Sequence, residues 1–237
     1  MSEIIIALDV PSSEQALDLV ERIGDDVDFY KVGSPLFTRS GPAIVRALRD
    51  RGKRVFLDLK YHDIPSTVAN AVTSAAELGV DLLTLHASGG ETMMRAARDA
   101  AGDDGPRLLG VTILTSFTAA DVEHVWNKEI ISVRDEVGRL ARLAAEAGLH
   151  GVVASPLEVE AIKRRHGADF LVVTPGIRPA GGSVADQART ATPADAARAG
   201  SDYLVIGRPV LAADDPTVVI RAVLTELESI DPRQAVS

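Results

Sequence analysis

Eight short apolar runs alternate with amphipathic segments along the chain, and this alternation constrains the fold more than any other feature. Each run is nearly continuous in apolar residues, as expected for strands buried on both faces of a parallel sheet. The segments between them repeat apolar residues with the period of a helix that buries one face, as in Val68, Val72, Ala75 and Ala76. The expected strands are Ile4–Val10, Val27–Gly33, Arg54–Lys60, Asp81–Ala87, Leu108–Leu114, Gly151–Ser155, Phe170–Pro175 and Tyr203–Gly207.

Eight strands alternating with eight helices predict a (β/α)8 TIM barrel, an α/β fold, as a single domain over residues 1–237. The main alternative is a doubly wound open sheet, which normally carries a glycine-rich dinucleotide turn after its first strand. Here the residues that follow are Asp9-Val-Pro-Ser-Ser, so the barrel is favoured. Glycines near the ends of the predicted helices are expected to form left-handed caps, namely Gly52, Gly79, Gly148, Gly167 and Gly200.

The composition excludes several classes of function. A net charge of -9 argues against a nucleic-acid partner, although it allows a small anionic ligand held by a few local cations. The chain has no cysteine, which excludes disulfides, thiolate metal sites and cysteine nucleophiles. No run approaches the roughly 20 apolar residues of a membrane span, and the first strand follows Met-Ser-Glu without the basic segment of a signal peptide. We therefore expect a cytoplasmic protein with no membrane partner.

Polar residues collect at the carboxyl ends of the predicted strands, where the reacting groups of such barrels lie. An apolar run is followed by a polar or charged residue at nearly every strand, which eight unrelated surface positions would not readily produce. In chain order these residues are Asp9, Lys31, Asp58 with Lys60, His86, Thr115, Ser155, Arg178 and Gly207-Arg208.

The end of the third predicted strand carries three charges in six residues. Because side chains alternate faces along a strand, Asp58 and Lys60 are expected to share one face. Asp63 follows beyond the strand, and Pro65 is expected to open a helix. A solvated ion pair is the simpler interpretation, but the polar residues at the other strand ends favour a catalytic group.

The loops after the last two strands predict a phosphate site, which such barrels often form at this place. Glycine lets the backbone approach an anion, and arginine binds phosphate oxygens in a bidentate manner. The loops contain Pro175-Gly-Ile-Arg178 and Ile206-Gly-Arg208, and Gln187 is placed to close over the ligand. Residues 115–131 and 176–191 are long connections of the kind that often bind ligands, and Trp126 is expected to anchor the first of them on the barrel or on a partner subunit.

These residues resemble the orotidine 5'-phosphate decarboxylase family, in its bacterial branch, over essentially the whole chain. Related metal-dependent keto-gulonate-phosphate decarboxylases and hexulose-phosphate synthases share the D-x-K-x-x-D spacing, but they place a glutamate at the end of the second strand for magnesium. This chain has Lys31 there, which favours the metal-free decarboxylase. The motifs are Asp58-Leu-Lys60-x-x-Asp63-Ile-Pro, Ala7-Leu-Asp9, Lys31-Val-Gly33, Pro175-Gly-Ile-Arg178 and Ile206-Gly-Arg208.

The resemblance implies conversion of orotidine 5'-phosphate to uridine 5'-phosphate and CO2 in de novo pyrimidine biosynthesis, with no metal or other cofactor. Lys60 would be the proton donor to C6 of the pyrimidine, and Asp58 would lie against the substrate carboxylate. Lys31 would hold the charge network and contact the ribose. The other substrate-binding residues implied are Asp9 at the ribose, Thr115 beside Ser116 at the pyrimidine, and Arg178, Gln187, Gly207 and Arg208 at the phosphate.

The resemblance also implies a homodimer with shared active sites, in which Asp63 and Thr67 reach into the neighbouring site and Ile64 joins them in binding substrate. Two other functions stay open from the residues alone. A metal-dependent sugar-phosphate lyase or epimerase needs a site rich in carboxylates, which Lys31 disfavours. A barrel that binds a phosphate or nucleotide without catalysis is disfavoured by the carboxylate of Asp58.

The two histidines near this site are weaker candidates. His62 is expected to face solvent in the loop after the third strand. His86 is expected to cap the fourth strand with a hydrogen bond.

Overall fold

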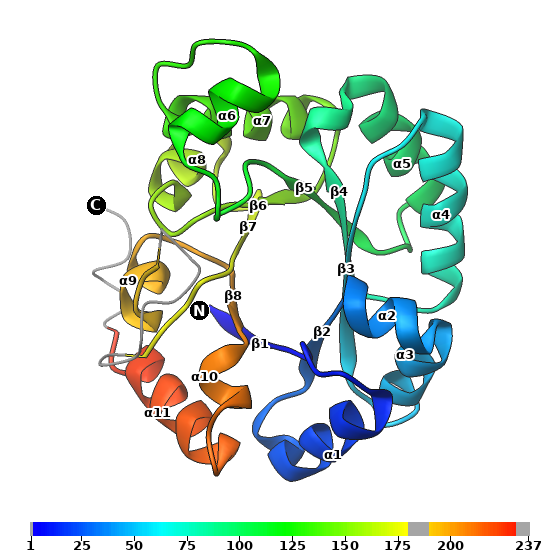
Figure 1. The fold of residues 1–237 in the computed structure, drawn as a ribbon, viewed down its shortest axis with the longest axis vertical. Helices are drawn as coiled ribbons and strands as arrows, with labels where there is room; N and C mark the ends of the chain where they lie inside the picture. The colour runs from blue at the N-terminus through cyan, green and yellow to red at the C-terminus, as the bar shows by residue number, and fades with distance from the viewer. Residues whose placement is uncertain (1, 180–189, 231–237) are drawn as a thin grey trace.

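Eight parallel strands close into a barrel in the computed structural model, which describes residues 2–179 and 190–230. Each strand pairs with the next one along the chain, and the last pairs with the first (Figure 1). The predicted barrel is confirmed, and every predicted strand overlaps an observed one. The strands are β1 Glu3–Ala7, β2 Phe29–Gly33, β3 Arg54–Tyr61, β4 Leu82–His86, β5 Arg107–Val111, β6 Gly151–Val153, β7 Leu171–Thr174 and β8 Tyr203–Ile206.

The predicted strand ends are less accurate than the predicted strands. The first strand ends at Ala7 and not at Val10. Leu8 is nonetheless fully buried, and Val10 packs against the same apolar cluster. Apolar residues therefore continue beyond the ladder of strand hydrogen bonds, and the sequence pattern follows burial more closely than it follows pairing.

Helices form a ring around the barrel (Figure 1). The expectation of eight helices is wrong for the described residues, because several connections hold two. Between β2 and β3, for example, Gly41 and Pro42 separate two short helices; Gly41 has a φ of 58°. The helices are α1 Ser13–Ile23, α2 Ser34–Ser40, α3 Pro42–Arg49, α4 Pro65–Glu77, α5 Glu91–Ala101, α6 Ala119–Trp126, α7 Val133–Glu146, α8 Val159–His166, α9 Pro193–Arg198, α10 Arg208–Leu211 and α11 Pro216–Glu228.

The local signals that ended the predicted helices are confirmed. All five glycines expected to adopt a left-handed conformation have positive φ, from 70° at Gly52 and Gly79 to 96° at Gly200. Pro65 opens α4 as expected. The long connection after β5 contains α6, and Trp126 at its end packs against the apolar core. Trp126 therefore anchors this connection on its own barrel.

The core has two layers because side chains alternate along each strand. One layer fills the barrel interior with residues such as Ile5, Phe56 and Leu82. The larger layer lies between strands and helices and includes Leu57 and Leu83. Phe56 and Asp58 thus point into the barrel, whereas Leu57 points toward the helices.

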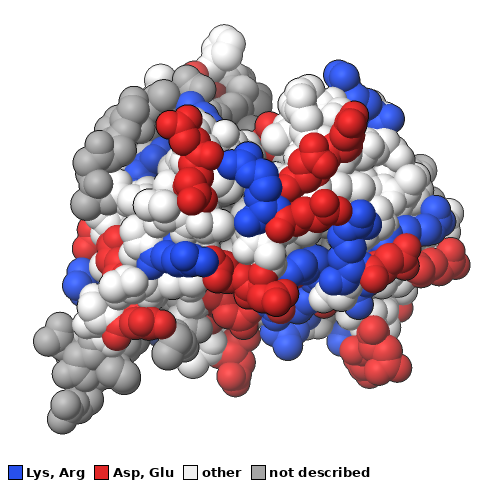
Figure 2. Space-filling view, turned by 90° about the horizontal axis from the view of Figure 1, so that it is seen from below, with Lys and Arg blue, Asp and Glu red and all other residues white. Residues whose placement is uncertain are grey.

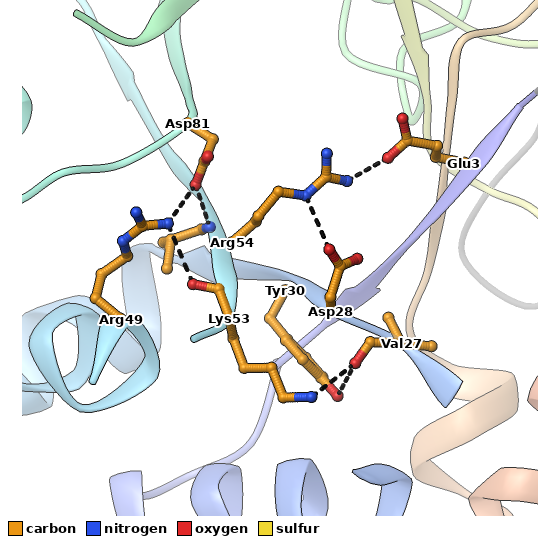
Figure 3. A network of polar contacts seen from close by, with 9 residues as sticks. Glu3, Val27, Asp28, Tyr30, Arg49, Lys53, Arg54 and Asp81 are labelled. Carbon is orange, nitrogen blue, oxygen red and sulfur yellow. Dashed lines mark hydrogen bonds and ion pairs between the residues drawn. The ribbon is translucent and has the colours of Figure 1, made fainter. Parts of the chain in front are cut away.

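The amino-terminal end of the barrel carries a network of polar contacts (Figure 3). The guanidinium of Arg54 lies 4.1 Å from the ring centre of Phe29 and forms ion pairs with Glu3 and Asp28. The Phe29 ring meets the ring of Tyr203 edge-on, with centroids 5.7 Å apart. These contacts link β1, β2, β3 and β8 at this end of the barrel.

The charges on the surface are mixed where the view of Figure 2 shows them. Basic and acidic side chains are interspersed across this face. Among the described residues, no helix is both long enough and apolar enough to span a bilayer.

Candidate active site

A cavity of about 250 Å³ opens at the carboxyl ends of the strands, at the opposite end of the barrel from the Arg54 network. It brings together most of the residues singled out from the sequence. Apolar side chains from the barrel interior, among them Phe56, Val153 and Val205, form its floor and walls. The predicted site residues that line it are Asp9, Lys31, Asp58, Lys60, Thr115, Arg178, Gly207 and Arg208.

Four charged side chains of alternating sign form a row along one side of the cavity. The Nζ atom of Lys31 lies 3.0 Å from Oδ1 of Asp9 and 3.7 Å from Oδ2 of Asp58. The Nζ atom of Lys60 lies 2.8 Å from both carboxylate oxygens of Asp58. We call these residues the charge row. In the described part of the chain, no three acidic or histidine side chains are grouped so as to hold a metal ion.

Asp58 is the most buried carboxylate of the charge row. Burial alone would raise the pKa of Asp58, because a charged group loses its hydration. The nearby charges of Lys31 and Lys60, with hydrogen bonds from Lys60 and Thr84, outweigh burial and hold the pKa of Asp58 below its usual range. The carboxylate is therefore ionised at neutral pH, in a place where water cannot screen it well.

Lys60 reaches Asp58 through an irregular backbone that the sequence did not predict. Leu57 pairs with Leu83, but the next pair is Tyr61 with Leu85, so three residues of β3 lie opposite one residue of β4. Lys60 lies in this bulge with a φ of 53°, a conformation uncommon for residues other than glycine. The predicted proximity of Asp58 and Lys60 is confirmed, but simple alternation along a regular strand is the wrong reason for it.

Thr84 is a buried polar residue that the sequence analysis missed. Its hydroxyl oxygen accepts a hydrogen bond from the Lys60 backbone N–H at 2.9 Å and donates one to Oδ1 of Asp58 at 3.0 Å. The available signal was one polar residue within the apolar run Leu82–Leu85. Threonine is common in strands, so that signal indicates a strand as readily as a site.

Gly33 is a second residue that the sequence analysis used only as part of a motif. A Cβ atom at this position would lie 3.0 Å from Nζ of Lys31 and 3.3 Å from Oδ1 of Asp9. The absence of a side chain therefore leaves space for the first ion pair of the charge row.

Two arginines line the cavity beyond the ends of β7 and β8. Burial and the nearby positive charge of Arg208 both lower the pKa of Arg178. The loop that carries Arg178 begins at Gly176, which has a φ of 82°, and the Arg178 N–H donates to the carbonyl of Ala191 at 3.0 Å. Two guanidinium groups held this close to each other suit an anionic ligand, which would relieve their repulsion. Gln187, also predicted for this site, lies outside the described residues.

Three predicted substrate-binding residues do not line the cavity. Asp63, Ile64 and Thr67 are exposed around the start of α4. The Asp63 carboxylate accepts the N–H of Ile64 at 2.7 Å, and Ile64 is 63% exposed. Within one protomer these residues are therefore separate from the charge row.

The two histidines and Ser116 also lie outside the cavity lining. His62 is exposed, as predicted, and its ring centre lies 5.4 Å from that of half-buried His86. Burial, with the charges of His62 and Lys60, lowers the pKa of His86. At neutral pH a neutral imidazole thus lies near the charge row without entering the cavity.

Comparison with known proteins identifies the family. The orotidine 5'-phosphate decarboxylase / HUMPS family profile matches residues 2–223. A curated orotidine 5'-phosphate decarboxylase from Moorella thermoacetica is 47% identical, covering 96% of this chain and 93% of its own length. One from Pelobacter propionicus is 50% identical, with 95% of each chain covered.

A crystal structure agrees with the sequence matches. Orotidine 5'-phosphate decarboxylase from Lactobacillus acidophilus superposes with a TM-score of 0.85 at 37% identity, covering 97% of this chain and 100% of the other. These three proteins carry the name of a carboxy-lyase and come from bacteria, as the resemblance to the bacterial branch implied. The chain therefore belongs to the orotidine 5'-phosphate decarboxylase / HUMPS family.

Proposed function

We propose that this protein decarboxylates orotidine 5'-phosphate to uridine 5'-phosphate without a metal ion, with Lys60 as proton donor. The observation that carries the proposal is the charge row, which lines one cavity together with Arg178 and Arg208. The near-full-length relatives named for this activity support the substrate. The product is a pyrimidine nucleotide, which places the reaction in pyrimidine biosynthesis.

The cavity suits a nucleotide that reaches from the two arginines to Lys60. The phosphate would bind Arg178 and Arg208, with the backbone at Gly207 close to it. The pyrimidine would lie toward Lys60, between Thr115 and apolar residues of the wall. Asp9 and Lys31 would then meet the ribose between the two ends. Gln187 would complete the phosphate site.

The chemistry requires a fixed positive charge where the carboxylate leaves. Breaking the C6–carboxylate bond releases CO2 and leaves its electron pair on C6, where the ring delocalises it poorly. The ammonium of Lys60 would stabilise that pair and transfer a proton to it, forming the C6–H bond. Solvent would then return a proton to the neutral amine, and no oxidant or reductant is needed.

Asp58 would act on the substrate carboxylate. Its buried carboxylate is kept ionised by the two lysines, so a substrate carboxylate beside it would be repelled until CO2 departs. Binding of the distant phosphate would offset this repulsion. A barrel that only binds nucleotides would gain nothing from a buried anion at this place.

Lys31 supports the metal-free reaction over a magnesium-dependent sugar-phosphate lyase. Magnesium sites in proteins use carboxylate and other oxygen ligands. Here the ammonium of Lys31 lies between the carboxylates of Asp9 and Asp58 and already compensates their charge.

A spectrophotometric assay tests the function directly. The purified protein should convert orotidine 5'-phosphate in the presence of excess chelator. Turnover only with added magnesium would favour the lyase class, and nucleotide binding by calorimetry without product would favour a binding protein. Either result would overturn the proposal.

We further propose a homodimer in which Asp63, Ile64 and Thr67 complete the neighbour's site. Their exposure around the start of α4, outside their own cavity, supports this arrangement. Sedimentation should show a dimer. Mixing equal amounts of inactive Lys60→Ala and Asp63→Ala subunits should restore about a quarter of the wild-type activity, since about half of the dimers are then mixed and each mixed dimer has one intact site of two. A mixture that stays inactive would place Asp63 in its own barrel. The cytoplasmic location remains a prediction.

A further inference from the structure

We propose that Thr84 is a positioning residue for the ammonium of Lys60. Its one hydroxyl forms hydrogen bonds with both the backbone N–H of Lys60 and the carboxylate of Asp58, and so fixes where the ammonium lies. The inference rests on the proposed function, because it assigns Thr84 to the proton transfer from Lys60.

Thr84 lies inside the barrel wall and is fully buried on β4. Its hydroxyl oxygen lies 2.9 Å from the backbone nitrogen of Lys60 and 3.0 Å from Oδ1 of Asp58. A hydroxyl can accept and donate at once, whereas the amide can only donate and the ionised carboxylate can only accept. The two partners therefore fix the direction of the hydroxyl proton, toward Asp58.

The bulge in β3 explains why a side chain is needed here. Between the pairs Leu57–Leu83 and Tyr61–Leu85, the regular ladder is interrupted. The Lys60 N–H donates its hydrogen bond to the Thr84 hydroxyl in place of a backbone carbonyl of β4. Lys60 is thus held at a φ of 53°, which a residue with a Cβ adopts only when its surroundings impose it.

The same hydroxyl links this backbone to the charge row. Oδ1 of Asp58 accepts from Thr84 and from Nζ of Lys60, the latter at 2.8 Å. The backbone and the side chain of Lys60 are therefore positioned against one carboxylate. Removing the hydroxyl would leave the amide of Lys60 without this acceptor and free the backbone to leave its strained conformation. The ammonium of Lys60 would then no longer be held in position, while the residues that bind the phosphate would be unchanged.

Valine has nearly the shape of threonine without the hydroxyl, so Thr84→Val is the test and Thr84→Ser is the rescue. Thr84→Val should lower kcat on the order of 10- to 100-fold, the range expected for losing a hydrogen bond to a charged group. Because the phosphate site is untouched, KM and the affinity for uridine 5'-phosphate should change less than about threefold. Thr84→Ser should return kcat to within about threefold of wild type.

Proton exchange separates positioning from a merely structural role. By microscopic reversibility, Lys60 should also exchange the C6 proton of uridine 5'-phosphate with deuterium in D2O, and NMR follows this exchange without decarboxylation. The exchange rate should fall with kcat in Thr84→Val and recover in Thr84→Ser. Thr174→Val is the matched control, because Thr174 is equally buried, on β7, and does not line the cavity. Its hydroxyl accepts a hydrogen bond from the Ser201 hydroxyl at 2.6 Å.

Wild-type kcat and exchange in Thr84→Val would overturn the inference. So would equal losses in Thr84→Val and Thr174→Val, or a serine variant no better than the valine variant. Should Thr84→Val fail to fold, comparing Thr84→Ala with Thr84→Ser gives the same decision. Failure of the wild-type protein to decarboxylate orotidine 5'-phosphate would instead contradict the proposed function.

Discussion

Replacing Lys60 by alanine removes the proposed proton donor and leaves the phosphate side of the cavity unchanged. General acid catalysis contributes about 10²- to 10⁴-fold. The lost charge contributes separately: Nζ lies 2.8 Å from the Asp58 oxygens, where the carboxylate of the substrate would also lie. Two unit charges about 4 Å apart interact by about 4 kcal/mol at an effective dielectric constant of about 20, which is close to a 10³-fold change in rate. These contributions overlap, so we expect kcat to fall at least about 10⁴-fold.

Ultraviolet absorbance of orotidine 5'-phosphate measures the rate, and calorimetry with uridine 5'-phosphate measures binding. Product affinity should change less than about tenfold, since the phosphate contacts remain. Lys163→Ala is the control: this lysine pairs with Asp202 at 2.7 Å and does not line the cavity, so its loss should affect stability and not turnover. A Lys60→Ala enzyme within about tenfold of wild-type kcat would refute the role of Lys60, because neither its proton nor its charge would then be required.

The other predictions concern the phosphate site, the charge row and stability. Arg208→Ala should lower kcat/KM for the nucleotide about 10- to 100-fold but leave the slow reaction of the phosphate-free nucleoside unchanged; equal losses on both substrates would contradict a phosphate contact. Gly33→Ala should push the Lys31 ammonium out of place and lower kcat about tenfold, whereas Gly138→Ala, where an added Cβ meets nothing within 4 Å, should not; matching rates would exclude this steric effect. Burial, aided by two nearby arginines, lowers the pKa of His150 in the folded protein. As the pH falls, the unfolded chain therefore binds a proton at this residue before the folded chain does. The contribution of His150 to stability is complete above about pH 6.5 and is lost as the pH falls through the lower folded pKa. Urea unfolding across that range should show a shallower loss for His150→Asn than for wild type, and identical pH slopes would argue against this contribution.

The fold could be predicted from the sequence because the chain alternates between two patterns of apolar residues. Strands buried on both faces are continuously apolar, and the covering helices repeat every three or four residues. Once the barrel is inferred, its geometry gathers strand ends such as Asp9 and Arg178 that are far apart in the chain. Their meeting at one cavity could therefore be predicted without knowing any side-chain contact.

The detailed geometry of the site could not be predicted, because it depends on contacts between strands. Lysine does not favour positive φ, and nothing local in residues 55–61 indicates that β3 bulges at Lys60. The bulge is stabilised by Thr84, a residue 24 positions away whose type is equally expected in an ordinary strand. The gap left at Gly33 for Lys31 is likewise visible only once β1 and β2 are paired.

The contact between Lys60 and Asp58 gives the site its chemical character. In the bulge, the ammonium of Lys60 lies 2.8 Å from both oxygens of Asp58. In the proposed reaction, the substrate carboxylate must enter beside these two charges, repelled by one and attracted by the other. Loss of CO2 removes the repulsion and leaves the ammonium beside the new electron pair, so the geometry that resists substrate binding is the one that favours the product of bond breaking.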